Sequence, residues 1–476
     1  MNVAILSPEI SLGAAAAVIL LAEAFSAGNL SRVAILALAT LGIAVSAAFL
    51  IPAQLAGVPT SSFSGAFIQN GFTIYFKLLM LMATFLVLLG SGRFLAQAEG
   101  RRAELVALVL LTTAALMLLV SSTELITLYI SLEMASLSTA FLAAWMKHQE
   151  RSAEAGLKFF LLNALSSAVL LYGIALLYGI TGQTQLNGIA RELVGGATPA
   201  LLLALALLLA GFGFKVSAVP FHMWTPDVYE GAPTPITAYL SVASKAAGFA
   251  VIVRVLQTAL PGVQTEWVGL IAILAAVTMT VGNIVAMVQT NIKRMLAYST
   301  IAQAGYILVG VAAGTGQGLG AVLFYLAAYT ATNLGAFIAI VEIADRTGSE
   351  RTSDFAGLHA RAPWLAFALA ISLLSLAGLP PLAGFFAKIY VFWAAIQTGL
   401  GWLVLLGVLN SAISLFYYAQ VIHHMYMVPA PSPAPGRSLP TLVAGLTVAI
   451  AGVFALGIFS GFFMGLAETA ARTLTQ

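Results

Sequence analysis

Charged side chains occur inside stretches of this sequence that are otherwise apolar enough to cross a membrane. Four of them have types suited to proton chemistry: Glu133, Lys215, Lys245 and Lys388. An ionised group at bilayer depth costs at least roughly 2.5–3.5 kcal/mol on insertion scales, so such residues are functional candidates. A desolvated lysine can release a proton, and a desolvated glutamate can take one up. These residue types therefore indicate proton transfer through a membrane.

Glu133 and two of the lysines form the first group. While an ionised Glu133 lies close, Lys215 or Lys245 keeps its charge, and when the groups separate the lysine passes its proton on. The competing interpretation is a static buried ion pair that fixes helix packing. Lys388 has no acid in its own span and follows Pro381 by about 10 Å of helix. We interpret Lys388 as a proton-loading site in the second half of the chain.

Two auxiliary candidates accompany this group. Lys158 lies one turn into its span and is either a second partner of Glu133 or a lysine that snorkels to the interface. His222 lies beside a proline-interrupted stretch and either passes a proton between Lys215 and the cytoplasm or bonds the loop backbone. Both choices stay open on the sequence alone.

Prolines interrupt two of the apolar stretches that carry lysines. One reads GFGFKVSAVPFHMWTPDVYEGAPTP (211–235) and contains Pro220, and the other contains Gly378-Leu379-Pro380-Pro381. Proline removes a backbone hydrogen bond and breaks a helix. The two interrupted helices stand five spans apart, an odd number, so the second copy is expected upside down. Inverted repeats with paired broken helices are typical of transporters.

Composition places the whole chain in the membrane. Its 476 residues are 61% hydrophobic and 8% charged, against about 25% charged in soluble proteins. The start of the sequence lacks a basic segment, so its first apolar run is expected to be a span and not a cleaved signal. Fourteen spans are expected, with the seventh and twelfth interrupted: 8–28, 31–51, 72–95, 104–121, 122–146, 154–181, 199–222, 236–259, 266–289, 293–313, 318–344, 364–398, 401–427 and 439–465.

Basic residues are unevenly divided between the two sets of connections. Twelve fall on one side: Arg32, Arg93, Arg101, Arg102, Lys147, Arg151, Lys293, Arg294, Arg346, Arg351, Arg361 and Arg437. Three fall on the other: Arg191, Arg254 and Arg472. The positive-inside rule makes the first side cytoplasmic and places both termini outside. The remaining five are lysines within spans, with no arginine among them; of these, Lys77 is expected to snorkel.

Motifs for other chemistry are missing. The sequence has no cysteine, and it contains no Walker motif, dinucleotide fingerprint, metal-ligand cluster or nucleophile elbow. Its net charge of +3 resides in loops that flank spans, so a nucleic-acid partner is not expected. We expect no cofactor-binding or metal-binding residues, and the energy for transport must come from a gradient or from a partner.

Five segments of the sequence resemble the antiporter-like membrane subunits of respiratory complex I. These are LYISLEMASLSTAF (128–141), EAGLKFFLLNALSSAVLLYGIALLYG (154–179), FGFKVSAVPFHMWTPDVYEGAPTPITAYLSVASK (212–245), QTNIKRMLAYSTIAQAGYILVG (289–310) and LSLAGLPPLAGFFAKIYVF (374–392). The WTPDVYEGAPTP run belongs to the wider superfamily, which includes cation/proton antiporters. The resemblance is strong over residues 120 to 400 and weak at both ends.

The resemblance implies a proton-translocating subunit of a redox-driven NADH-quinone oxidoreductase. It matches Glu133, Lys215, Lys245 and Lys388 to the family's proton axis, and Lys158 and His222 to auxiliary positions. It implies that NADH, FMN, iron–sulfur clusters and quinone are bound by partner subunits, and that neighbouring membrane subunits and the lipid bilayer surround the chain. Span eleven departs from related subunits, because it offers Tyr325, Tyr329 and Asn333 in place of a lysine or histidine.

These observations together predict an all-α polytopic protein of the bacterial inner membrane. We expect flanking helices in 1–103, a first five-helix repeat in 104–260, an inverted second repeat in 261–428, and a Pro-rich linker with a C-terminal helix in 429–476. Two alternative functions remain: a subunit of a cation/proton antiporter or membrane-bound hydrogenase complex, and a passive scaffold whose charges only set helix packing. Neighbouring genes for iron–sulfur and flavin subunits would favour the respiratory function over the antiporter.

Overall fold

The protein is a bundle of membrane-spanning helices. The computed structural model describes residues 3–57, 59–97, 101–193, 196–429 and 439–474. Within these residues, thirteen helices are long and apolar enough to cross a membrane, and two shorter apolar helices stand where the twelfth span was expected. The predicted polytopic helical fold is therefore confirmed. Most of the predicted Pro-rich linker (430–438) lies outside the described residues.

The described residues from Val3 to Gly231 form a short 3-10 helix (Val3–Leu6), ten α-helices and one short hairpin. The elements are α1 (Ser7–Phe25), α2 (Arg32–Ala56), β1 (Thr60–Ser62), β2 (Phe67–Gln69), α3 (Gly71–Gly90), α4 (Gly92–Gln97), α5 (Arg102–Ser121), α6 (Leu125–Ala143), α7 (Glu150–Thr181), α8 (Leu186–Glu192), α9 (Pro199–Val216) and α10 (Trp224–Gly231). The hairpin pairs β1 with β2 in antiparallel fashion and lies between the expected spans 31–51 and 72–95.

The remaining elements complete the bundle. They are α11 (Thr234–Tyr239), α12 (Lys245–Arg254), α13 (Gln264–Ala286), α14 (Ile292–Ala312), α15 (Gly316–Thr347), α16 (Leu358–Arg361), α17 (Pro363–Ala377), α18 (Ala383–Gln397), α19 (Gly401–Met427), α20 (Pro440–Ile458) and α21 (Ser460–Arg472). A π-helical turn, Leu240–Ser244, joins α11 to α12, and a second, Val255–Ala259, follows α12. Such turns inside helices frequently mark functional sites.

Both interruptions expected from the prolines are present. Helix α9 ends at Val216 with Ser217 in the left-handed conformation, and the chain resumes as α10. Helix α17 ends at Ala377 with Gly378 at a φ of +92°, and α18 begins after the two prolines. A positive φ at this position is the usual way for a helix to end on glycine. Each break leaves carbonyl groups without helical partners.

Small residues let neighbouring helices pack closely, and the outer helices surround three central spans. A Cβ added to Gly305 in α14 would lie 2.5 Å from the backbone nitrogen of Met279 in α13, so glycine lets these two backbones approach closely. The Thr234–Ala259 segment, α14 and α15 are the most enclosed spans. They form the centre of the bundle, where the lysine-bearing breaks lie against them.

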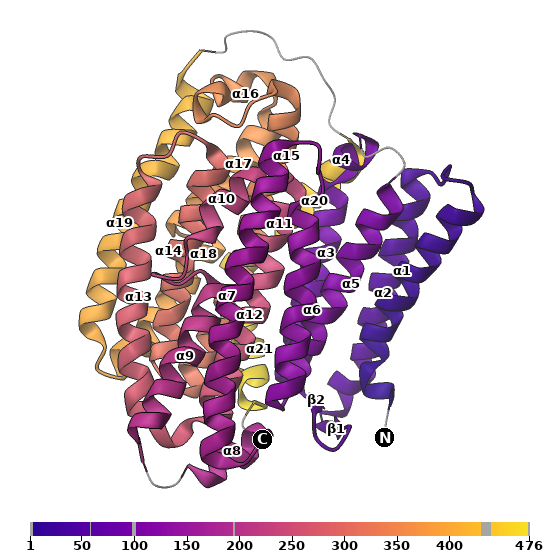
Figure 1. Cartoon of the computed structure of the whole chain (residues 1–476). Coiled ribbons are helices and arrows are strands. Elements are labelled where there is room, and N and C mark those ends of the chain that lie inside the picture. The colour runs from indigo at the N-terminus through magenta and orange to yellow at the C-terminus, as the bar shows by residue number, and fades with distance from the viewer. Residues whose placement is uncertain (1–2, 58, 98–100, 194–195, 430–438, 475–476) are drawn as a thin grey trace.

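Both termini lie at one end of the molecule, which we call the termini side (Figure 1). Helices α4 and α16 lie at the other end, the opposite side. Helices α1 and α2 form one edge of the bundle, while α13 and α19 form the other. Helix α9 lies toward the termini side and α10 toward the opposite side, so the first break falls deep in the bundle.

Candidate proton-transfer site

Lys215 lies in the last turn of α9, immediately before the first break. Its side chain is buried, and its Nζ donates hydrogen bonds to Ser136 Oγ of α6 and, over 2.5 Å, to Asn163 Oδ1 of α7. Two neutral oxygens from two helices therefore hold the ammonium group. The fold therefore brings Lys215 against α6, the helix that carries Glu133.

Asn163 connects Lys215 to Glu133. Its Nδ2 donates to Glu133 Oε2 over 3.4 Å, while its Oδ1 accepts from Lys215. Glu133 Oε1 accepts a 2.6 Å hydrogen bond from Ser167. Within the described structure the glutamate and the lysine form no direct ion pair within 4.0 Å, so the pair is bridged by an amide. A neutral amide transmits polarisation between the charges while keeping them apart.

Sequence analysis did not single out the neutral partners Ser136, Asn163 and Ser167. A signal was present, because Asn163 and Ser167 are four residues apart and therefore on one face of their helix. A cavity of about 20 Å³ adjoins this cluster and is lined by Ser136, Lys215 and Trp224 among others. This volume is enough for one water molecule.

Lys245 begins α12 directly after the π-helical turn Leu240–Ser244. Its side chain is 2% exposed, and its Nζ donates to Ser217 Oγ, which in turn shares a hydrogen bond with Thr225. The Nζ also lies 4.8 Å from the centroid of the Trp224 ring, a favourable position for a cation. No carboxylate of the described residues lies within ion-pair distance of this lysine.

The first break therefore joins the two lysines. Ser217 follows Lys215 by two residues and caps the C-terminal end of α9, and its hydroxyl is the acceptor for Lys245. Trp224, at the start of α10, donates its Nε1–H over 2.9 Å to the carbonyl of Phe214, one of the carbonyls near the helix end. Any movement of the break changes the surroundings of both lysines together.

Neutral polar side chains connect the first half of the bundle to the second. Asn333 of α15 donates over 2.7 Å to Ser241, and its Oδ1 is buried without a partner in the described structure. Further along are three bonds between side chains of different helices: Tyr329 to Thr300 over 2.9 Å, Tyr325 to Gln303 over 2.5 Å, and Ser299 with Tyr418 over 2.5 Å. The series starts at Ser241, close to Lys245, and reaches the second break, where Gln303 also donates over 3.0 Å to the carbonyl of Leu376.

Lys388 lies at the second break. It is 5% exposed, and its Nζ donates over 2.8 Å to the carbonyl of Ala377, the last residue of α17. The same Nζ lies 4.6 Å from the centroid of the Tyr306 ring. Within the described structure no carboxylate lies within 4.0 Å, in agreement with the absence of an acid from its span.

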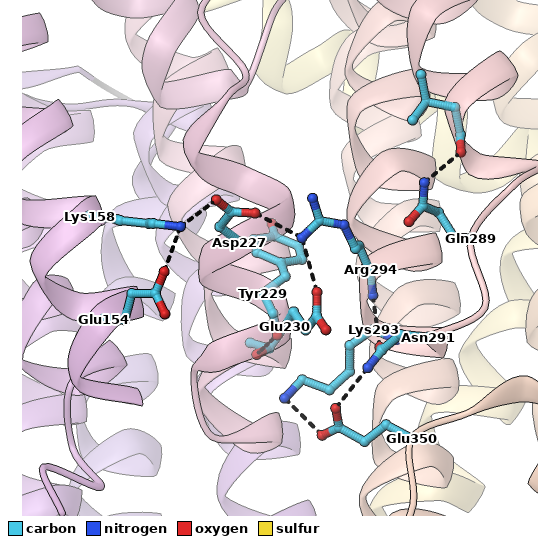
Figure 2. A network of polar contacts seen from close by, with 12 residues as sticks. Glu154, Lys158, Asp227, Tyr229, Glu230, Gln289, Asn291, Lys293, Arg294 and Glu350 are labelled. Atoms are coloured by element: carbon cyan, nitrogen blue, oxygen red, sulfur yellow. Dashed lines mark hydrogen bonds and ion pairs between the residues drawn. The ribbon is translucent and has the colours of Figure 1, made fainter. Parts of the chain in front are cut away.

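Lys158 belongs to a network of charges on the opposite side, shown in Figure 2. Its Nζ pairs with Glu154 at 2.7 Å and with Asp227 at 2.8 Å, and not with Glu133. Asp227 also accepts a 2.8 Å hydrogen bond from Arg294 of α14. Partial burial raises the pKa of the Asp227 carboxyl, but hydrogen bonds from Lys158 and Arg294 outweigh it and hold the pKa below its usual value. One carboxylate therefore joins α7, α10 and α14.

The neighbouring Lys293 was predicted in a connection, but it is buried at the start of α14. Its Nζ pairs with Glu350 at 3.0 Å (Figure 2). The same Nζ donates over 2.8 Å to the carbonyl of Ala232. The Ala232 carbonyl lies just past the end of α10. The network thus fixes both the α10 segment and the start of α14.

Two predictions about charges near the termini side are wrong. Lys77 does not snorkel: it is 0% exposed and pairs inside the protein with Glu9, in the first turn of α1, at 2.7 Å. Arg254 does not lie in a connection but within the Thr234–Ala259 span, 3% exposed, so the spans contain an arginine as well as lysines. The guanidinium lies 5.2 Å from the centroid of the Phe72 ring.

His222 lies in the break between α9 and α10, as expected. Its Nδ1 is buried and has no hydrogen-bond partner in the described structure. The ring nevertheless lies against the backbone of Pro220, so both sequence-based interpretations of His222 stay open. Throughout the described residues, no three His, Cys, Asp or Glu side chains gather closely enough to hold a metal ion.

Comparison with known proteins gives consistent matches over the whole chain. The family model for NADH:quinone oxidoreductase/Mrp antiporter transmembrane subunits matches residues 122–414. A curated relative, NADH-quinone oxidoreductase subunit N of Trichlorobacter lovleyi, is 42% identical over 483 residues that cover 100% of this chain and 98% of the relative.

Solved structures share the same fold. A chain of respiratory complex I from Thermus thermophilus with bound aureothin matches with a TM-score of 0.82 and 33% identity, covering 97% of this chain and 99% of that chain. A chain of the Mrp complex from Dietzia sp. matches with a TM-score of 0.88 and 22% identity, covering 100% and 98%. The second likeness shows the fold alone, because its sequence identity is low.

Proposed function

Because the chain belongs to the NADH:quinone oxidoreductase/Mrp antiporter family of membrane subunits, we propose that it translocates protons as subunit N of a redox-driven NADH-quinone oxidoreductase. The observation that carries this proposal is the bridged contact Lys215–Asn163–Glu133 deep in the bundle. A scaffold gains stability more cheaply from apolar packing than from buried charges. Buried groups that exchange protons through neutral partners serve transfer better than packing.

The mechanism we propose starts at the first break. With Glu133 ionised, its negative charge favours the protonated form of Lys215 through the Asn163 amide. If α6 and α7 move relative to α9, this stabilisation falls and Lys215 releases its proton. Ser217 lies between Lys215 and the next acceptor, because its hydroxyl already bonds Lys245. Movement of the break would thus drive the proton from the first lysine to the second.

The second half of the axis runs from Lys245 to Lys388. No lysine or histidine of α15 bridges this distance, so transfer depends on the amides and hydroxyls of Asn333, Tyr329 and Tyr325 together with water. The buried, unpartnered Oδ1 of Asn333 offers one acceptor for such a water. Lys388 then loads or releases the proton at the second break. Lys158 and His222 act as auxiliary groups between the first break and the opposite side.

We assign the two halves to inverted repeats, over 104–260 and 261–428, with 1–103 and 429–476 as flanking segments. Each half contains one interrupted helix whose break holds a lysine, at α9–α10 and at α17–α18. Such paired broken helices near the centre of a bundle favour transport at the interface of the repeats.

The surroundings of the chain follow from the same assignment. NADH, FMN, iron–sulfur clusters and quinone would bind in partner subunits, and neighbouring antiporter-like and small membrane subunits would contact this chain in a bacterial inner membrane. The opposite side, which holds the network of Figure 2, would face the cytoplasm, and the termini side the periplasm. This chain contributes proton carriage, and electron transfer occurs elsewhere in the complex.

The test is replacement of Lys215 by alanine in the assembled complex. We expect proton pumping per quinone reduced to be lost, while electron transfer from NADH to artificial acceptors persists. The control is Lys147→Ala, which removes an exposed lysine between α6 and α7. Wild-type pumping in an assembled Lys215→Ala complex would refute the proton role of this residue and favour a scaffold.

A further inference from the structure

Arg254 is a buried cation that forms no ion pair with any carboxylate of the described residues. Its side chain is 3% exposed, and its Nε and Nη2 are buried without a hydrogen-bond partner in the described part of the chain. Its guanidinium carbon lies 5.2 Å from the centroid of the Phe72 ring. Arginine keeps its proton in proteins, so this position carries a permanent positive charge. Burying a charge without a partner has a large desolvation penalty, so we expect this charge to serve a function.

The position of Arg254 relative to the proton axis is informative. It follows Lys245 by nine residues, or roughly 13 Å along the helix, and points to the other face, toward α3. The helix continues into the Val255–Ala259 turn, which packs against α8 on the termini side. Arg254 therefore lies between Lys245 and the termini side.

A second buried cation in the same part of the bundle is neutralised. Lys77 of α3, five residues beyond Phe72, pairs with Glu9 at 2.7 Å. Where a buried charge serves packing, the fold thus supplies a carboxylate. Arg254 has no such partner, although Thr258, one turn further, offers a position from which an acid could reach it. The three buried charges Lys77, Glu9 and Arg254 therefore sum to one positive charge.

We propose that Arg254 is an electrostatic barrier that prevents protons at Lys245 from leaking along the first half of the bundle to the termini side. A fixed positive charge in a medium of low dielectric constant repels an excess proton over the distance involved, and arginines exclude protons and cations from other membrane pathways in this way. With this route closed, a proton on Lys245 moves on toward Lys388. The inference rests on the proposed function, because only a chain that carries protons needs such a barrier.

The test measures passive proton conductance, without electron transfer. The assembled complex is reconstituted in liposomes that contain a pH-sensitive dye, and a potassium gradient with valinomycin imposes a membrane potential. Arg254→Met keeps an unbranched side chain about as long as the aliphatic stem of arginine and removes the charge. It is expected to raise proton influx by roughly tenfold, the lower end of the effect that a focused charge has on the local ion concentration. Arg254→Lys keeps the charge and is expected to conduct like the wild type.

Two matched variants separate charge from packing. Thr258→Glu keeps the guanidinium in place but neutralises it, so it is expected to leak as Arg254→Met does, and it serves as the test if Arg254→Met fails to assemble. Glu9→Gln combined with Lys77→Met removes the neighbouring pair without changing the net charge, and should leave influx unchanged. Wild-type influx in both neutralised variants, or a leak in Arg254→Lys equal to that in Arg254→Met, would overturn the proposal. Lost pumping in Lys215→Ala alongside such a result would leave the proposed function intact.

Discussion

Lys388 donates a 2.8 Å hydrogen bond from its Nζ to the carbonyl oxygen of Ala377, the residue at which α17 ends. The carbonyl at a broken helix end has no partner within its own helix and needs a donor. A protonated lysine makes a stronger hydrogen bond than a neutral amine, because its donor is charged. The protonation state of Lys388 is therefore coupled to the geometry of the second break.

Replacing Lys388 by arginine is expected to abolish pumping although it keeps a cation and a donor at the break. Arginine does not release its proton, so the site would be permanently loaded. We expect the pumping rate to fall to about a tenth of the wild-type value or less, equivalent to at least ~1.4 kcal/mol of barrier. The measurement is proton uptake per quinone reduced in vesicles, with Lys388→Met as the variant that lacks the charge. Retention of pumping in the arginine variant would rule out titration at this site.

Gly378→Ala is expected to disturb Lys388 directly. The residue has a φ of +92°, and an added Cβ would lie 3.1 Å from Lys388 Cδ. The left-handed backbone alone costs an alanine roughly 1–2 kcal/mol. Gly399→Ala is the matched control, because Gly399 has a φ of +80° but nothing within 4 Å of its added Cβ. We expect both variants to lose thermal stability and only Gly378→Ala to lose pumping. Equal pumping in the two variants would show that the added methyl group at residue 378 does not disturb Lys388.

The sequence predicted the elements that hold the site because apolar runs and prolines act locally. The span of 104–121, the breaks beside Pro220 and Pro380, and the depth of Lys215, Lys245 and Lys388 all follow from patterns within single segments. Hydrophobic length decides whether a segment spans, and proline decides where it breaks. No contact between distant segments was needed for these predictions.

Partners between segments could not be predicted in the same way. The amide of Asn163 between Lys215 and Glu133, and the carboxylate of Glu9 beside Lys77, depend on how helices far apart in sequence rotate against each other. The burial of Arg254 was missed because a charge near the end of a span reads as interfacial when its neighbours are unknown. Only the packing of α3 against α12 shows that Phe72 covers it.

Asn163→Leu is expected to uncouple Glu133 from Lys215 while leaving the helix intact. The change removes one acceptor of the lysine and one donor to the glutamate, and it keeps the number and branching of the side-chain heavy atoms. The buried Lys215 then keeps only Ser136 as acceptor, and the partly buried Glu133 keeps only Ser167 as donor, so the two charges are no longer linked through one side chain. We expect at least a tenfold loss of pumping rate, measured as above. Ser166→Ala, three residues along α7, removes only a 3.5 Å contact to the carbonyl of Gly211 and should pump normally.

Asp227→Asn tests the network in Figure 2 through pH. The ion pairs of Asp227 with Lys158 and Arg294 are partly exposed, so each contributes about 0.2–1 kcal/mol. Because the pKa of Asp227 lies below its usual value of about 3.9, its stabilisation is present above that pH and is lost as the pH falls through the lower, folded-state pKa. The difference in Tm between the wild-type and variant complexes should therefore be constant from neutral pH to about pH 5 and shrink below about pH 4. A difference that grows in acid would contradict this assignment.

Asn333→Leu tests whether the two halves of the bundle communicate through the neutral residues of α15. Asn333 donates to Ser241, four residues before Lys245, and its free Oδ1 is the acceptor that we assign to a bridging water. Leucine removes both groups, so protons should reach Lys245 but pass slowly to Lys388, and the pumping rate should fall about tenfold or more, equivalent to ~1.4 kcal/mol of barrier. Thr330→Val is the matched control, because the Thr330 hydroxyl bonds only the carbonyl of Leu326 within its own helix. If Asn333→Leu pumps as well as Thr330→Val, transfer between the halves does not use this amide, and the path must run through the hydroxyls of Tyr325 and Tyr329 alone.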